Sequence, residues 1–156
     1  MRYIIVIGEY AINDEGSEFS FVAAKRVTHV EAPLFPNDTS FPSNNTSKTS
    51  ITWYNFCENA GLLDMFYESD KQIRGGYPGY FDLTSNHLMQ VQNALTNRRL
   101  TNNGKPPGYA PTGLWLYLQG NNAVVEYDGV LAKLIWLEWW IRWALLNCSK
   151  PIVSIY

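Results

Sequence analysis

The first thirty residues carry the alternating pattern of two β-strands. Residues 2–12 are rich in Ile, Val and Tyr, and residues 17–30 bring further Phe and Val. A run of Asn, Asp, Glu and Gly at 13–16 separates them, and such a turn between two β-forming runs predicts an antiparallel hairpin. Residues 33–50 then change to Pro, Asn, Ser and Thr, a composition that predicts a long exposed loop.

A helical period begins after residue 50. Apolar side chains recur at intervals of three and four residues, at Trp53, Phe56, Cys57 and Ala60. We expect Ser50 or Thr52 to cap this helix and Gly61 to end it. The apolar piece 62–67 predicts a further helical turn, and the Gly- and Pro-rich run 74–81 is expected to be neither helix nor regular strand.

A second helix is expected to begin at Thr84 or Ser85. It carries a narrow apolar stripe of Leu88, Val91 and Leu95. Arg98 and Arg99 end it, where positive charge suits the negative end of the helix dipole.

The last third of the chain predicts a strand, a long helix and a final strand. A second loop rich in Gly and Pro, residues 104–111, precedes the expected strand 114–118. Residues 123–127 fit either a hairpin or an early start of the long helix, which extends from about 128 to 147. A proline then stops this helix, and residues 152–156 predict the last strand.

Together these elements predict one compact α+β domain over residues 1–156. We expect a small, mainly antiparallel sheet, made of the N-terminal hairpin and one or two later strands. About three helices should pack on this sheet, with the long Trp-rich C-terminal helix at the centre.

The C-terminal helix is the strongest signal in the sequence, because it is apolar nearly all round. Its only charged residues between 129 and 147 are Lys133, Glu138 and Arg142, and the last two are spaced to pair at i, i+4. Three charges, each costing about 2.5–3.5 kcal/mol at a bilayer centre, argue against a membrane span. Two interpretations stay open: a central core helix, or a helix with one tryptophan edge that binds a partner protein or a second copy. The candidate edges are Trp139 with Trp143, and Trp136 with Trp140.

The two loops offer a second candidate site. Tyr77, Tyr80 and Tyr109 could supply flat stacking surfaces, and Arg74 and Lys105 could meet a phosphate or carboxylate. Turn chemistry, with the tyrosines packed over the core, explains the same residues. No glycine-rich phosphate-binding motif supports the ligand interpretation.

Little in the sequence supports a catalytic or metal-binding site, and we assign no catalytic residue, metal or cofactor. His29 and His87 have no metal-ligand spacing. Cys57 falls on the apolar stripe of its helix, which disfavours a Cys–His nucleophile. Paired carboxylates, such as Glu126 with Asp128, are expected to be solvated near surface turns.

Composition limits the classes of partner that the chain could bind, and the N-terminus and the cysteines indicate its compartment. The chain has 46% hydrophobic and 17% charged residues and a net charge of −2, which excludes a disordered protein. Its basic residues are scattered, which argues against duplex nucleic acid as a partner. Because the N-terminus lacks a secretory signal, we expect a cytoplasmic protein with Cys57 and Cys148 as free thiols.

These observations support one leading hypothesis and two alternatives. The first is a small non-enzymatic interaction protein that binds a protein partner or itself through the tryptophan edge and the loops. Its composition resembles that of small accessory proteins of phages or mobile elements, although no particular residue carries that resemblance. The second is a small-ligand or nucleotide-binding protein that uses the loop tyrosines, and the third is an enzyme built on Cys57 or His87.

Overall fold

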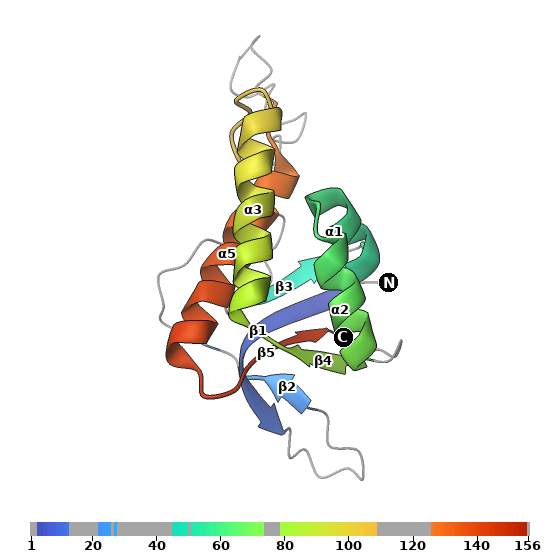
Figure 1. Cartoon of the computed structure of the whole chain (residues 1–156), viewed down its shortest axis with the longest axis vertical. Coiled ribbons are helices and arrows are strands. Elements are labelled where there is room, and N and C mark those ends of the chain that lie inside the picture. The colour runs from blue at the N-terminus through green and yellow to red at the C-terminus, as the bar shows by residue number, and fades with distance from the viewer. Residues whose placement is uncertain are drawn as a thin grey trace, which may run out of the picture.

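The structure is a computed structural model of the chain. It describes residues 3–12, 22–25, 27, 45–49, 51–73, 79–108 and 126–155. In chain order its elements are β1 (Tyr3–Ile12), β2 (Val22–Ala24), β3 (Thr46–Thr49), α1 (Trp53–Ala60), α2 (Leu63–Ile73), β4 (Gly79–Asp82), α3 (Ser85–Thr101), α5 (Gly129–Asn147) and β5 (Pro151–Ile155). Figure 1 shows these helices packed against an antiparallel sheet, which confirms the predicted α+β class.

The sheet has the strand order β2-β1-β5-β4, and β3 pairs with β1. The predicted N-terminal hairpin is confirmed, since β1 and β2 pair antiparallel with Tyr10 opposite Ala24. The C-terminal strand β5 lies between β1 and β4 and is antiparallel to both. Pro151 stands at the first position of this strand, where a missing N–H is tolerated.

One edge of β1 changes partner halfway along its length, from β3 to β2. Asn45 fills the junction, because its Nδ2 donates to the carbonyls of Ile7 (2.8 Å) and Lys25 (3.0 Å). Gly8 leaves the space for this approach, since a Cβ there would lie 3.0 Å from the Lys25 carbonyl oxygen. The buried amide of Asn45 therefore joins three strands.

Two predictions about loops need correction. The stretch 33–50 was expected to be loop, yet its residues 46–49 form β3, held to β1 by main-chain pairing and by Asn45. The run 74–81 was expected to hold no regular strand, yet β4 begins at Gly79, pairs with β5 and buries Phe81 completely. Both strands are four residues long, too short for alternation to reveal them, and tertiary pairing decides their conformation. Residues 33–44, 50 and 74–78 lie outside the described part of the chain, as does the expected strand 114–118.

The helices begin and end largely where the sequence predicts. Thr52 caps α1 by accepting a hydrogen bond from the Asn55 N–H, and Gly61 ends the helix with a φ of 74°. Thr84 caps α3, and Asp128 caps α5 through the Leu131 N–H. In the piece 62–67, predicted as one further turn, residues 63–67 belong to the longer helix α2.

The main core lies between the helices and one face of the sheet. Its fully buried side chains include Trp53, Phe56, Phe81, Trp136 and Trp140. The helix α5 occupies its centre, in contact with α1, α3, β1 and β5. Helices α3 and α5 run antiparallel, since Gln92 reaches Glu138 while Arg98 reaches Asp128. A smaller cluster on the other face of the sheet contains Val6, Ala24 and Ile152, with Ile4, Tyr10 and Tyr80 packed against it.

Candidate functional site

The two sides of α5 differ sharply in exposure. Its buried side chains from the second turn onward, here called the inner face, are Leu134, Trp136, Leu137, Trp140, Ile141 and Ala144, and Leu131 in the first turn is buried as well. The side chains that recur on the opposite side at helical spacing, here called the outer face, are Ile135, Trp139, Arg142, Trp143 and Leu146. On the outer face Leu146 is 79% exposed, and Trp139 and Trp143 are only partly buried.

This difference separates the two candidate tryptophan edges. Trp136 and Trp140 are completely buried in the folded chain, so a partner cannot reach their surfaces. Trp139 and Trp143 remain accessible in part. Of the two predicted edges, therefore, only Trp139 with Trp143 offers a surface for binding.

The partly exposed tryptophans are held in place by a buried one. The ring of Trp140 packs edge-on against Trp139, with ring centres 4.8 Å apart, and against Trp143, with ring centres 5.2 Å apart. Such T-shaped contacts are a favourable geometry for aromatic rings. These contacts with the buried ring therefore favour the orientation in which the two outer rings are found.

A charged pair lies within this apolar surface. The Arg142 guanidinium donates to both carboxylate oxygens of Glu138, at 3.0 and 3.4 Å, which confirms the predicted i, i+4 pair. Gln92 of α3 also approaches Glu138, with Nε2 3.4 Å from Oε1. The side chain of Glu138 is mostly covered, whereas that of Arg142 is 49% exposed. The guanidinium is therefore the accessible member of the pair.

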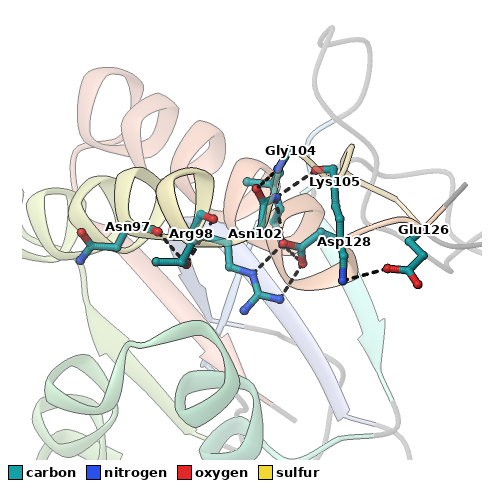
Figure 2. A network of polar contacts seen from close by, with 9 residues as sticks. Asn97, Arg98, Asn102, Gly104, Lys105, Glu126 and Asp128 are labelled. Atoms are coloured by element: carbon teal, nitrogen blue, oxygen red, sulfur yellow. Dashed lines mark hydrogen bonds and ion pairs between the residues drawn. The ribbon is translucent and has the colours of Figure 1, made fainter.

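A buried carboxylate fixes the N-terminal end of α5, as Figure 2 shows. The Arg98 guanidinium donates to Asp128 through Nε (2.6 Å) and Nη2 (2.9 Å), and Asn102 Nδ2 adds a third hydrogen bond at 3.2 Å. Burial by itself would raise the pKa of Asp128. The hydrogen bonds from Arg98, the Leu131 N–H and Asn102, together with the Arg98 charge, outweigh that effect and lower the pKa to about 2.

Asp128 corrects the expectation of a solvated carboxylate, because its side chain is 1% exposed. An Asp directly before a helical pattern is a recognisable N-cap signal. Its partner Arg98 is thirty residues away in sequence, and only the antiparallel packing of α3 on α5 brings the two together.

Lys105, a predicted anion-binding residue, belongs to the segment next to this network. Its ammonium pairs with Glu126 at 3.1 Å, and its carbonyl accepts a hydrogen bond from Asn102 Nδ2 at 2.9 Å (Figure 2). Asn103 and Gly104 turn the chain here with φ of 57° and 73°. The cation of Lys105 is thus already matched by a carboxylate.

Tyr80, the other described member of the predicted loop site, lies elsewhere. Its ring packs edge-on against Tyr10 at 5.4 Å, and the Lys150 ammonium lies 3.9 Å from the Tyr10 ring centre and 5.6 Å from that of Tyr80. Tyr80 precedes α3, whereas Lys105 follows it, and a helix of this length spans about 25 Å. The two residues are therefore separated by the length of α3, while Arg74, Tyr77 and Tyr109 lie outside the described residues.

The thiols lack the environment of a nucleophile. Cys57 is completely buried, and burial raises the pKa of its thiol. Burial, together with the nearby Glu9 carboxylate, raises the pKa of Cys148 to about 11. A reactive cysteine requires a lowered pKa, so neither thiol is activated.

His87 serves the fold as a helix cap. Its Nδ1 accepts a hydrogen bond from the Thr84 N–H at 3.1 Å, and its Nε2 lies 3.3 Å from Glu68 Oε2. Burial lowers the pKa of His87 more than Glu68 raises it, and the ring is almost inaccessible. Within the described ranges no cluster of three or more His, Cys, Asp or Glu side chains could hold a metal ion, and His29 lies outside them.

Comparison with known proteins adds no information about function, so the functional proposal rests on the geometry described above. No protein-family model, curated protein or solved structure matches the chain. In the part of the chain that the structure describes, no helix combines the length and apolar character needed to cross a membrane.

Proposed function

We propose that this chain is a non-enzymatic interaction protein that binds a protein surface through the outer face of α5. The observation that carries the proposal is that α5 is apolar nearly all round, although the rest of the chain buries only one side of it. A helix that is apolar all round is normally covered all round. Here the inner face is buried, whereas the outer face ends in a leucine that is 79% exposed.

The residue types on the outer face suit protein recognition. Trp and Arg are the residues most enriched among those that dominate binding energy in interfaces. Trp139, Arg142 and Trp143 lie within five consecutive positions on this face. Each square ångström of apolar surface that a partner covers would contribute about 25 cal/mol.

The rigidity of the helix supports the same proposal. The Asp128 network anchors the first turn of α5 to α3, and Trp140 orients the two partly exposed rings. A surface that is already ordered loses little conformational entropy when it binds. Binding here would require no rearrangement of the helix.

The two alternatives are weakened by the placement of their residues. The small-ligand hypothesis combined the tyrosines of both loops with Arg74 or Lys105, and its two described residues, Tyr80 and Lys105, are separated by α3. The enzyme hypothesis needed an activated thiol or an accessible imidazole, and burial acts against both.

Two leucines of equal exposure provide a matched test. Leu146 on α5 and Leu100 on α3 are each 79% exposed. We expect the purified protein to self-associate in size-exclusion chromatography with light scattering, or to bind a hydrophobic fluorescent dye. Leu146→Asp should diminish that association or dye signal, and Leu100→Asp should leave it unchanged. A strict monomer without dye binding would overturn the proposal.

A further inference from the structure

We infer that the partner of the outer face is a second copy of this chain, with the two α5 helices antiparallel across a twofold axis between Trp139 and Arg142. This inference rests on the proposed function and names its partner. It follows from the order and spacing of the residues on the outer face.

Four residues run along the middle of that face: Ile135, Trp139, Arg142 and Leu146. Their separations are four, three and four positions, so the spacing is the same in both directions along the helix. A twofold axis between two antiparallel helices pairs the first of these residues with the last, and the two inner residues with each other. Because the spacing is the same in both directions, all four residues of one helix face residues of this set on the other helix in a single alignment.

The chemistry of the paired residues agrees with this register. Ile135 of one copy meets Leu146 of the other, which covers the exposed leucine with an apolar side chain. Arg142 of one copy meets Trp139 of the other, and a guanidinium over an indole ring is a favourable cation–π contact. Each contact occurs twice because the interface is symmetric.

The charge of Arg142 stays compensated in this arrangement. Glu138 lies one turn away and already accepts hydrogen bonds from Arg142 at 3.0 and 3.4 Å. Covering the pair therefore leaves no isolated charge, which is the costly outcome at an interface. A parallel pair of helices, in contrast, would place the two Arg142 side chains against each other.

The size of the contact predicts a weak dimer. From Ile135 to Leu146 the outer face extends along about 16 Å of helix, and Trp143 widens it on one side. This contact is small compared with standard interfaces, which bury about 800 Å² per partner. We therefore expect a monomer–dimer equilibrium that depends on protein concentration.

Cross-linking between two different variants tests the register. Both preparations carry Cys148→Ser, which removes the accessible native thiol, whereas Cys57 stays buried and unreactive. One preparation adds Ile135→Cys and the other adds Leu146→Cys. A short bismaleimide is suitable because helix axes pack about 8–10 Å apart, which is wide for a disulfide. We expect covalent dimers when the two preparations are mixed and few with either alone. Leu100→Cys in place of Leu146→Cys serves as the control.

Sedimentation velocity over a range of concentrations tests the equilibrium itself. Wild-type protein should move from monomer to dimer as concentration rises. Arg142→Glu should weaken the dimer about tenfold or more, because the cation–π contact is lost and like charges gather at the axis.

The outcomes separate this inference from the proposed function. Cross-links between identical positions would show a parallel pair and overturn the inferred register. A monomer at every concentration would overturn the second copy as partner. If that monomer still binds the hydrophobic dye in a manner that Leu146→Asp removes, the proposed function stands with a different protein as partner. If it binds no dye, both fail.

Discussion

On its inner face α5 buries Trp136 and Trp140 completely, whereas on its outer face it leaves Trp139 and Trp143 partly exposed and Leu146 largely exposed. The residue types on the two faces are nearly the same, and their surroundings differ. The sheet and the helices α1 and α3 cover one face, so its side chains stabilise the fold. We propose that the other face stabilises a complex.

This comparison shows why the tryptophan content of a helix does not by itself identify an interface. Two of its four tryptophans serve the core of this one chain. A test of function must therefore separate stability from association, and substitutions on the two faces should change different quantities.

The largest expected effect is on the inner face. Trp140→Ala should lower the free energy of unfolding by about 3–5 kcal/mol, since it leaves a large cavity in the core. The indole N–H of Trp140 finds no hydrogen-bond partner among the described residues, so packing accounts for its contribution. Urea denaturation measures the loss. A change below about 1 kcal/mol would contradict the central position of α5.

The next effect concerns the anchor at the start of α5. Asp128→Ala should lower the free energy of unfolding by about 2 kcal/mol, because it removes an N-cap and the carboxylate that accepts two hydrogen bonds from Arg98 and one from Asn102. Glu126→Ala, which breaks only the exposed pair with Lys105, should cost less than about 1 kcal/mol. Equal losses in the two variants would contradict the role of the buried network.

The anchor should also give an acid-dependent loss of stability. The pKa of Asp128 is lowered from 3.8 to about 2 in the folded chain, so its stabilisation is complete above pH 4 or so and is lost as the pH falls toward 2. Asp128→Asn should reduce this loss in urea titrations.

Much of the fold could be predicted from the sequence because its signals are local. The stripe of Trp53, Phe56 and Cys57, the Thr52 cap and Gly61 define α1 within ten residues. The strands β3 and β4 could not be predicted, since their four residues gain order from pairing with β1 and β5. Asn45 likewise gave no signal, because its partners Ile7 and Lys25 are distant in sequence.

The candidate site was predictable only in part, for a related reason. Helical spacing groups Trp139 with Trp143 and Trp136 with Trp140, but it does not say which pair faces the core. That choice depends on where the sheet and α3 pack, which is a tertiary property. Spacing also could not show that Tyr80 and Lys105 lie at opposite ends of one helix.

A smaller effect distinguishes the cap of α3 from that of α5. His87 caps α3 as a neutral ring, and burial lowers its pKa below the ordinary 6.5. Its contribution is therefore complete above pH 6.5 and is lost as the pH falls below that value, because the unfolded chain takes up the proton first. His87→Gln keeps an acceptor for the Thr84 N–H without titrating. Wild-type stability in urea should fall between pH 7 and pH 5 more steeply than that of the variant, and parallel curves would contradict this role.

The smallest expected change in stability, and the most informative, is at Leu146. In dilute solution Leu146→Asp should alter the free energy of unfolding by less than about 0.5 kcal/mol, because the side chain is 79% exposed. Ala144→Asp, two residues earlier on the inner face, should prevent stable folding by burying a charge. If the outer face binds a second copy, wild-type stability will rise with protein concentration, since a ligand of the native state stabilises it. The Leu146→Asp variant will show no such rise, and the difference between the two concentration series measures association separately from folding.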